Sequence, residues 1–139
     1  AGAAGLFLYL CLGGLLLGGD STIDEVKDGT LGGYKSLTVG EAFDNYSQFK
    51  STSWESFETQ NGKQVVQFKG DVRIPQRLKD RGSSKAVLIV QFLINDDDSF
   101  ALNAMQMNAV ENGRSVSQNL YTMADGILAK IYNNEAIMN

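Results

Sequence analysis

Residues 53–74 read SWESFETQNGKQVVQFKGDVRI and contain the clearest hairpin in the chain. Two runs suited to strands, 53–60 and 63–74, flank Asn61-Gly62, the residue pair that type I′ turns prefer. The sequence therefore predicts that the folded domain is built around an antiparallel hairpin.

The turn also predicts which side chains share a face. A two-residue turn at Asn61-Gly62 would place Phe57 opposite Val66 and on the same face as Phe68. We expect this face to be buried and Trp54 to lie on the other face.

Two further strands are predicted after the hairpin. Residues 86–95, AVLIVQFLIN, are nearly all apolar, which is typical of a central strand covered on both faces. The acidic stretch 96–99 then indicates a turn, and residues 100–110 alternate well enough for a fourth strand that Asn112-Gly113 would end.

Helices are expected on both sides of this strand region in the sequence. Thr38 and Glu41 form a capping-box pattern before an apolar stripe over 39–49, and a second stripe predicts a helix over about 117–133. The predicted fold class is α+β, an N-terminal apolar helix followed by a four-stranded antiparallel meander with two helices packed on one face.

The apolar helix is expected over residues 1–19, AGAAGLFLYLCLGGLLLGG, which precede the first charged side chain, Asp20. As a helix the run would extend about 28 Å, close to the thickness of a bilayer core. A helix that is apolar on every side lies in lipid or among other copies of itself. Small residues at one face would let such helices approach closely: Ala4, Cys11, Gly14 and Gly18.

We expect residues 20–37 to form an acidic, Gly-containing linker and residues 38–139 to form the α+β head domain. The linker carries four acids: Asp20, Asp24, Glu25 and Asp28. A basic loop follows the hairpin and includes Arg77, Lys79 and Arg81. This loop is either simply solvated or a contact for an acidic surface, such as lipid headgroups or the acidic linker of a neighbouring copy.

The composition excludes several kinds of chemistry. The chain has no histidine, a single cysteine and a net charge of −4, which excludes Ser–His–Asp triads, Cys/His zinc sites and internal disulfides and argues against nucleic acid as a partner. The three acids at 96–98 lack the alternate spacing of a calcium loop, so a turn is preferred there. We expect no metal and no cofactor.

A resemblance to known proteins lies in residues 26–72, VKDGTLGGYKSLTVGEAFDNYSQFKSTSWESFETQNGKQVVQFKGDV. The stretch resembles small bacterial envelope proteins of unknown function that share the patterns V-K-x-G-x-L, T-V-G-x-A-F-D-x-Y, W-x-x-F and G-x-x-V-V-x-F. By layout the chain also looks like a type IV pilin, with Ala1 and Gly5 where that family has Phe and Glu. Both resemblances imply a bacterial cell-envelope location with the head outside the cytoplasm.

Two functions are compatible with these features. The first is a structural subunit whose apolar helices pack together to build an extracellular filament or envelope complex, after an initial stage in the membrane. The alternative is a monomeric, membrane-anchored extracytoplasmic binding module. An enzyme using carboxylates such as Glu41, Asp44 or Asp71 has no support in their spacing, so we expect no catalytic activity.

Overall fold

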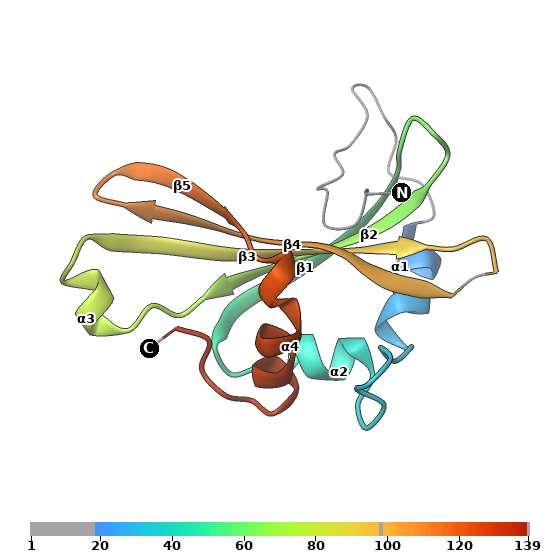
Figure 1. Ribbon diagram of the computed structural model, residues 1–139, viewed down its shortest axis with the longest axis horizontal. Coiled ribbons are helices and arrows are strands. Elements are labelled where there is room, and N and C mark those ends of the chain that lie inside the picture. Colours follow the sequence, from blue (N-terminus) through green and yellow to red (C-terminus); the bar gives the residue numbers. More distant parts are fainter. Residues whose placement is uncertain (1–18, 98, 139) are drawn as a thin grey trace.

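An antiparallel five-stranded sheet is the framework of the protein (Figure 1). The structure is a computed structural model that describes residues 19–97 and 99–138. The strands lie side by side in sequence order: β1 (Phe49–Glu58), β2 (Gln64–Val72), β3 (Ser83–Ile94), β4 (Phe100–Glu111) and β5 (Arg114–Asn119). The most apolar strand, β3, is therefore the central one, as its sequence predicted.

Short helices accompany the sheet, and most of them lie on one of its faces (Figure 1). Their bounds are α1 (Gly19–Lys27), α2 (Val39–Asp44), α3 (Gln76–Lys79), the 3₁₀ helix η1 (Tyr121–Met123) and α4 (Ala124–Tyr132). The capping box of α2 is confirmed, because Thr38 Oγ1 accepts a hydrogen bond from the Glu41 amide while the Glu41 carboxylate accepts one from the Thr38 amide.

The core lies between these helices and the sheet, and Phe43 of α2 is at its centre. The Phe43 ring is fully buried and lies 4.9 Å from Phe68, 6.0 Å from Phe92, 6.1 Å from Trp54 and 6.3 Å from Tyr132, between ring centroids. Edge-to-face packing of this kind adds to the free energy of burying the rings. A six-residue helix is too short to be stable alone, so this packing holds α2 in place.

Polar contacts fasten α1 to the same core. Asp44 accepts a hydrogen bond from Trp54 Nε1 at 2.8 Å and forms an ion pair with Lys27 of α1, with 2.9 Å between Nζ and Oδ2. Val26, the neighbour of Lys27, is 0% exposed. Residues from the expected linker thus take part in the core.

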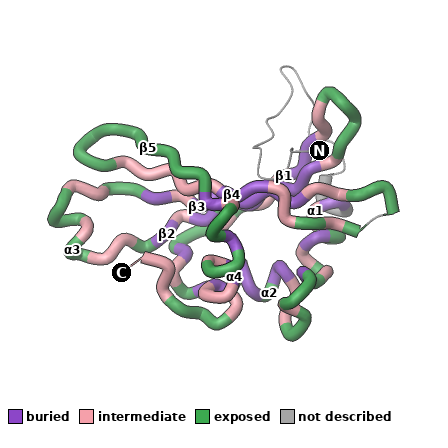
Figure 2. Tube along the Cα trace, viewed as in Figure 1, coloured by how far each residue is buried: buried purple, intermediate pink, exposed green. Residues whose placement is uncertain are grey.

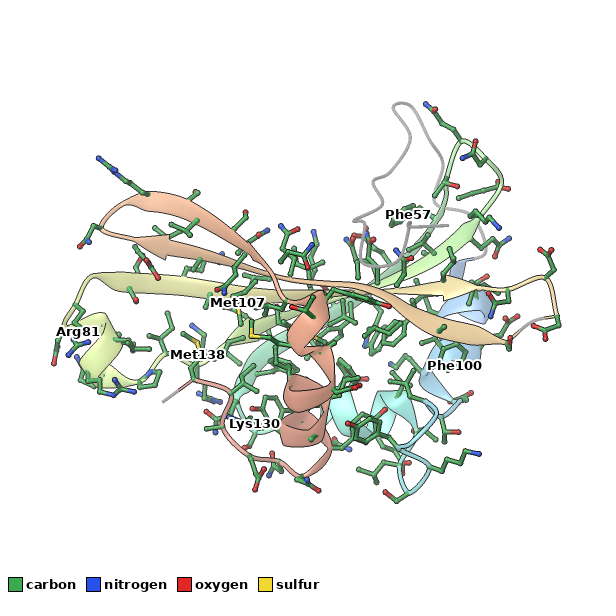
Figure 3. All side chains as sticks on the ribbon, viewed as in Figure 1. Phe57, Arg81, Phe100, Met107, Lys130 and Met138 are labelled. Atoms are coloured by element: carbon green, nitrogen blue, oxygen red, sulfur yellow. The ribbon has the colours of Figure 1, made fainter. Side chains whose placement is uncertain are left out.

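The opposite face of the sheet carries a buried row of polar side chains. Gln91 donates to Gln67 at 2.7 Å, and Gln67 donates to Glu55 at 2.7 Å. Phe57 also points to this face, away from the helices (Figure 3), and Figure 2 shows that the burial continues along the central strands. Because the amides bond to one another, their burial does not leave them unsatisfied.

The predicted hairpin is present, but its register differs by one residue. The loop has three residues, because the Thr59 amide donates to the Lys63 carbonyl at 2.8 Å and Gly62 adopts a φ of 81°. Phe57 consequently pairs with Val65, and Trp54 pairs with Phe68. A shift of one residue exchanges the two faces of a strand. Trp54 therefore joins the helix-covered core instead of Phe57.

The expected count of four strands is wrong. Asn112 and Gly113 do not end the sheet; both adopt positive φ, 53° and 79°, and turn the chain back into β5. Positive φ at both central residues is characteristic of a type I′ hairpin. The helix predicted from residue 117 accordingly starts only at η1, and α4 ends at Tyr132.

The predicted architecture is also wrong at its start. No apolar N-terminal helix occurs among residues 19–97 and 99–138, and the first helix there, α1, has the polar sequence GDSTIDEVK. The apolar run itself, residues 1–18, lies outside the described residues. Of the helices that are described, none has both the length and the apolar character needed to cross a bilayer.

Candidate functional site

The residues predicted to pack helices together are not part of the described structure. Ala4, Cys11, Gly14 and Gly18 all fall in residues 1–18. Their role in self-association stays a prediction.

The residues predicted to make charged contacts lie at two ends of the molecule. Asp24, Glu25 and Asp28 are exposed on or just after α1, while Asp20 belongs to α1 only through its backbone, since its side chain is not described. Arg77, Lys79 and Arg81 are exposed on and after α3, at the other end of the sheet (Figures 1 and 3). The two sets do not meet within one chain, and a contact between copies stays a prediction.

The acidic turn after β3 behaves as a turn. The Asn95 amide donates to the Ser99 carbonyl at 2.7 Å, and the Asp97 carboxylate accepts hydrogen bonds from the Ser99 hydroxyl and amide, which lower the pKa of Asp97. Within the described ranges no group of three or more metal-ligating side chains comes together.

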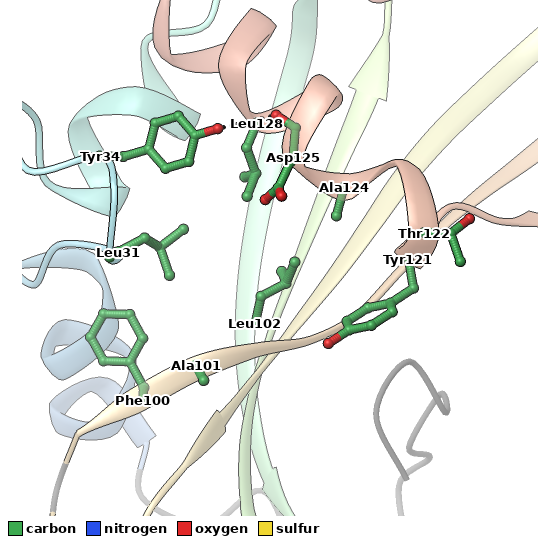
Figure 4. Close-up of a pocket in the computed structure, with 11 residues that line it drawn as sticks. Leu31, Tyr34, Phe100, Ala101, Leu102, Tyr121, Thr122, Ala124, Asp125 and Leu128 are labelled. Atoms are coloured by element: carbon green, nitrogen blue, oxygen red, sulfur yellow. Dashed lines mark hydrogen bonds between the residues drawn. The ribbon is translucent and has the colours of Figure 1, made fainter. Parts of the chain in front are cut away.

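A cleft of about 360 Å³ opens between the first strand residues of β4, the chain before α2, and the η1–α4 segment (Figure 4). Three segments that are far apart in sequence form it, and we call it the tyrosine cleft. It is lined by Leu31, Gly32, Tyr34, Phe100, Ala101, Leu102, Tyr121, Thr122, Ala124, Asp125 and Leu128.

Local backbone geometry positions one wall of the cleft. Leu31 and Tyr34 form a small antiparallel bridge, in which the Tyr34 amide donates to the Leu31 carbonyl at 3.0 Å across Gly33, whose φ is 87°. Gly29 lies so close to the Phe100 ring that a Cβ there would approach Cε1 to 2.6 Å. Phe100 thus lies between the Gly29 backbone and the cleft.

The opposite wall depends on the end of β5. The Leu120 amide donates to the Met105 carbonyl at 2.8 Å, and the Tyr121 amide donates to Asn119 Oδ1 at 2.9 Å. These bonds fix the start of η1 against β4. Tyr121 and Asp125 then project from η1 and the first turn of α4 toward the cleft (Figure 4), and Thr122 also contributes to the lining.

Two tyrosines meet beside the cleft. The Tyr34 hydroxyl donates to the Asp125 carbonyl at 3.1 Å, and its ring stacks on Tyr132 with 4.7 Å between centroids. Burial raises the pKa of Tyr132 to about 12, and the nearby Tyr34 adds to the shift. Tyr132 is therefore neutral over the physiological pH range.

The carboxylate of Asp125 is the chemically distinctive group of the cleft. Within the described part of the chain it has neither an ion-pair partner nor a side-chain hydrogen bond, and the Tyr121 hydroxyl likewise has no hydrogen-bond partner there. Both groups border an apolar floor of Leu31, Leu102 and Leu128. The arrangement suits recognition of a ligand with an apolar body and a positive charge.

A second hollow, of about 330 Å³, lies on the same face between β5, α4 and the C-terminal segment. Figure 3 shows Met107 and Met138 close together on this side of the sheet. We call it the methionine groove; its apolar lining comprises Met107, Ala109, Val116, Leu120, Met123, Ile127, Ile137 and Met138. The C-terminal segment is held near it because the Tyr46 hydroxyl donates to the Glu135 carbonyl and accepts from the Ile137 amide.

Sequence reasoning missed the tyrosine cleft. Tyr34 stands in a Gly-rich segment interpreted as a linker, and Tyr121 and Asp125 fell within one long predicted helix. An aromatic residue directly after Gly32-Gly33 was the only signal, and it is weak.

Comparisons of the chain with protein-family models, with curated proteins and with solved structures found no match. The resemblances to envelope proteins and pilins therefore stay predictions.

Proposed function

We propose that this chain is a non-catalytic binding domain whose tyrosine cleft takes a ligand with an aliphatic body and a terminal positive charge, such as the lysine side chain of a peptide. The observation that carries the proposal is that Asp125, an exposed carboxylate, is the one charged residue among the described residues lining the cleft and borders an apolar floor. A cation with an aliphatic stem satisfies both parts of that site, because the stem covers the leucines while the charge reaches the carboxylate.

The size and the aromatic rim support the same ligand. A volume of about 360 Å³ lies at the lower end of the usual range for ligand pockets, which fits one or two side chains better than a large cofactor. Phe100 and Tyr121 line the cleft, and aromatic faces attract cations. The aspartate also belongs to the first turn of α4, where a negative charge is favourable without any ligand. A test must therefore measure binding and not only stability.

The test compares two probes that differ only in charge, Nα-acetyl-lysine amide and Nα-acetyl-norleucine amide, by titrating the ¹⁵N-labelled chain in NMR. We expect the lysine probe to shift the amides of Tyr34, Ala101 and Tyr121. It should bind up to about fivefold more tightly than the norleucine probe, because an ion pair with an exposed carboxylate contributes at most about 1 kcal/mol. Asp125→Asn should abolish this preference. Asp24→Asn removes an exposed acid on α1 and should preserve it. Equal binding of both probes to the unmodified chain, or a preference that survives Asp125→Asn, would refute the proposal.

The structural-subunit function, with self-association through residues 1–19 and a cell-envelope location, remains a separate prediction. It depends on residues outside the described structure and is compatible with a head that binds a ligand.

A further inference from the structure

The free edge of β5 differs from the other edge of the sheet. All six residues of β5 are exposed, and its pairing with β4 has no register shift. Sheet edges are usually protected by charges, proline or bulges. β1 has a register shift between Phe49 and Ser51 and carries Lys50, Glu55 and Glu58, whereas residues 115–119 of β5 contain neither a charge nor a proline.

The register shows which backbone groups this edge offers. Glu111 of β4 and Arg114 of β5 flank the two-residue turn, so they exchange backbone hydrogen bonds with each other. In an antiparallel hairpin, every second β4–β5 pair after them does the same. Val116 therefore bonds inward to Ala109. The amide and carbonyl groups of Ser115 and Ser117 point outward, toward the open edge.

The same strand carries an exposed apolar side chain on its helix-covered face. Val116 is 43% exposed and Met123 is 47% exposed, and in the described part of the chain no other large apolar side chains have comparable exposure. Both line the methionine groove. Among residues 19–97 and 99–138, an open strand edge and an uncovered apolar groove thus lie side by side.

We propose that two copies of this chain pair antiparallel through β5, with the two-fold axis at Val116. Ser115 of each copy then exchanges backbone hydrogen bonds with Ser117 of the other, and Val116 contacts its own counterpart. The only charged residue of β5, Arg114, falls opposite Gln118, so no like charges meet. The two methionine grooves become neighbours across the seam, and the exposed Val116 side chains cover each other.

A second copy fits this edge because, in this register, residues 114–118 of the two copies meet compatible side chains. Serine faces serine, valine faces valine and arginine faces glutamine. This contact is distinct from the predicted packing of residues 1–19, and it joins the heads themselves.

The proposal can be tested by placing a charged side chain at Val116, on the proposed two-fold axis of the dimer. Val116→Lys and Val116→Glu each put two like charges directly opposite one another, whereas an equimolar mixture puts lysine opposite glutamate. Sedimentation equilibrium of the full chain would give the dimer dissociation constant. We expect it to rise about tenfold for either variant alone and to recover in the mixture. Fluorescence of Trp54, which is half-buried in the core, verifies that each variant is folded.

Ser53→Lys and Ser53→Glu place the same charges at an exposed position of β1 and should leave the dissociation constant unchanged. Any association through residues 1–19 is common to all these variants and cancels in the comparison. A folded Val116→Lys chain that associates like the Ser53→Lys chain, or variants whose mixture does not recover, would overturn the proposal.

Discussion

Replacing Tyr132 with phenylalanine is expected to stabilise the protein, because the hydroxyl oxygen of Tyr132 is buried and no described residue supplies it with a hydrogen-bond partner. An unpaired buried polar group costs about 1–3 kcal/mol. The Tyr132 ring as a whole is only half-buried, so we expect a gain near the lower limit, about 1 kcal/mol.

The pH dependence of the free energy of unfolding above pH 10 provides a second test, and the direction of the expected change follows from the pKa of Tyr132. Burial raises the pKa of Tyr132 to about 12, above the value near 10 of an exposed tyrosine. Between these two values the unfolded chain releases the proton while the folded chain retains it, so the free energy of unfolding falls as pH rises. Tyr132→Phe removes this titration, and its advantage over the unmodified chain should grow from pH 10 to pH 12.

Urea unfolding followed through Trp54, the only tryptophan of the chain, measures both effects. The matched control is Tyr34→Phe, in the ring stacked on Tyr132. The Tyr34 hydroxyl donates to the Asp125 carbonyl at 3.1 Å, so its loss should destabilise by about 0.5–1 kcal/mol. If Tyr132→Phe destabilises the chain as much as Tyr34→Phe does, the Tyr132 hydroxyl has a partner and the reasoning is wrong.

Two further predictions concern the scaffold. Gly70→Ala should destabilise by about 1–3 kcal/mol in urea unfolding, because a Cβ there would lie 2.8 Å from the buried Phe49 ring, whereas Gly126→Ala in α4 meets nothing within 4 Å and should stabilise by about 0.5–1 kcal/mol. Equal effects of the two substitutions would contradict this. Hydrogen bonds from the Thr38 amide and hydroxyl lower the pKa of Glu41, so its contribution is present above the ordinary glutamate pKa and is lost as pH falls through the lowered value. Glu41→Gln should reduce the loss of thermal stability between pH 5 and pH 3, while Glu25→Gln, at an exposed position of α1, should not.

The elements that the sequence predicted correctly have strong local signals. The apolar run of β3 contains little that suits solvent, and a central strand is where such a run is covered on both faces. The capping box of α2 is a contact between residues three apart, so it requires no knowledge of the remaining fold.

The errors arise where the signal is weak or depends on loop length. RSVSQN has no apolar period, because an edge strand exposed on both faces buries little surface. By its sequence alone, the Asn112-Gly113 pair before it predicts a strand end as readily as a turn into another strand. Asn61-Gly62 correctly predicts a turn, but the loop there has three residues instead of the expected two. The extra residue shifts the strand register by one. That single residue decides which of Trp54 and Phe57 joins the aromatic core.

The tyrosine cleft could not be predicted because none of its three segments indicates a site by itself. Tyr34 is positioned by a bridge across Gly33, and Phe100 by its contact with Gly29. Tyr121 is positioned by the hydrogen bond that its backbone amide donates to Asn119 Oδ1, at the end of a strand that the sequence did not reveal. An α-helix has more residues per turn than a 3₁₀ helix. A continuous α-helix from residue 117 would therefore point Tyr121 and Asp125 in directions different from those that the observed 3₁₀ turn gives them. The chemistry of the cleft therefore depends on where β5 ends, and the error in the strand count and the missed site have the same physical origin.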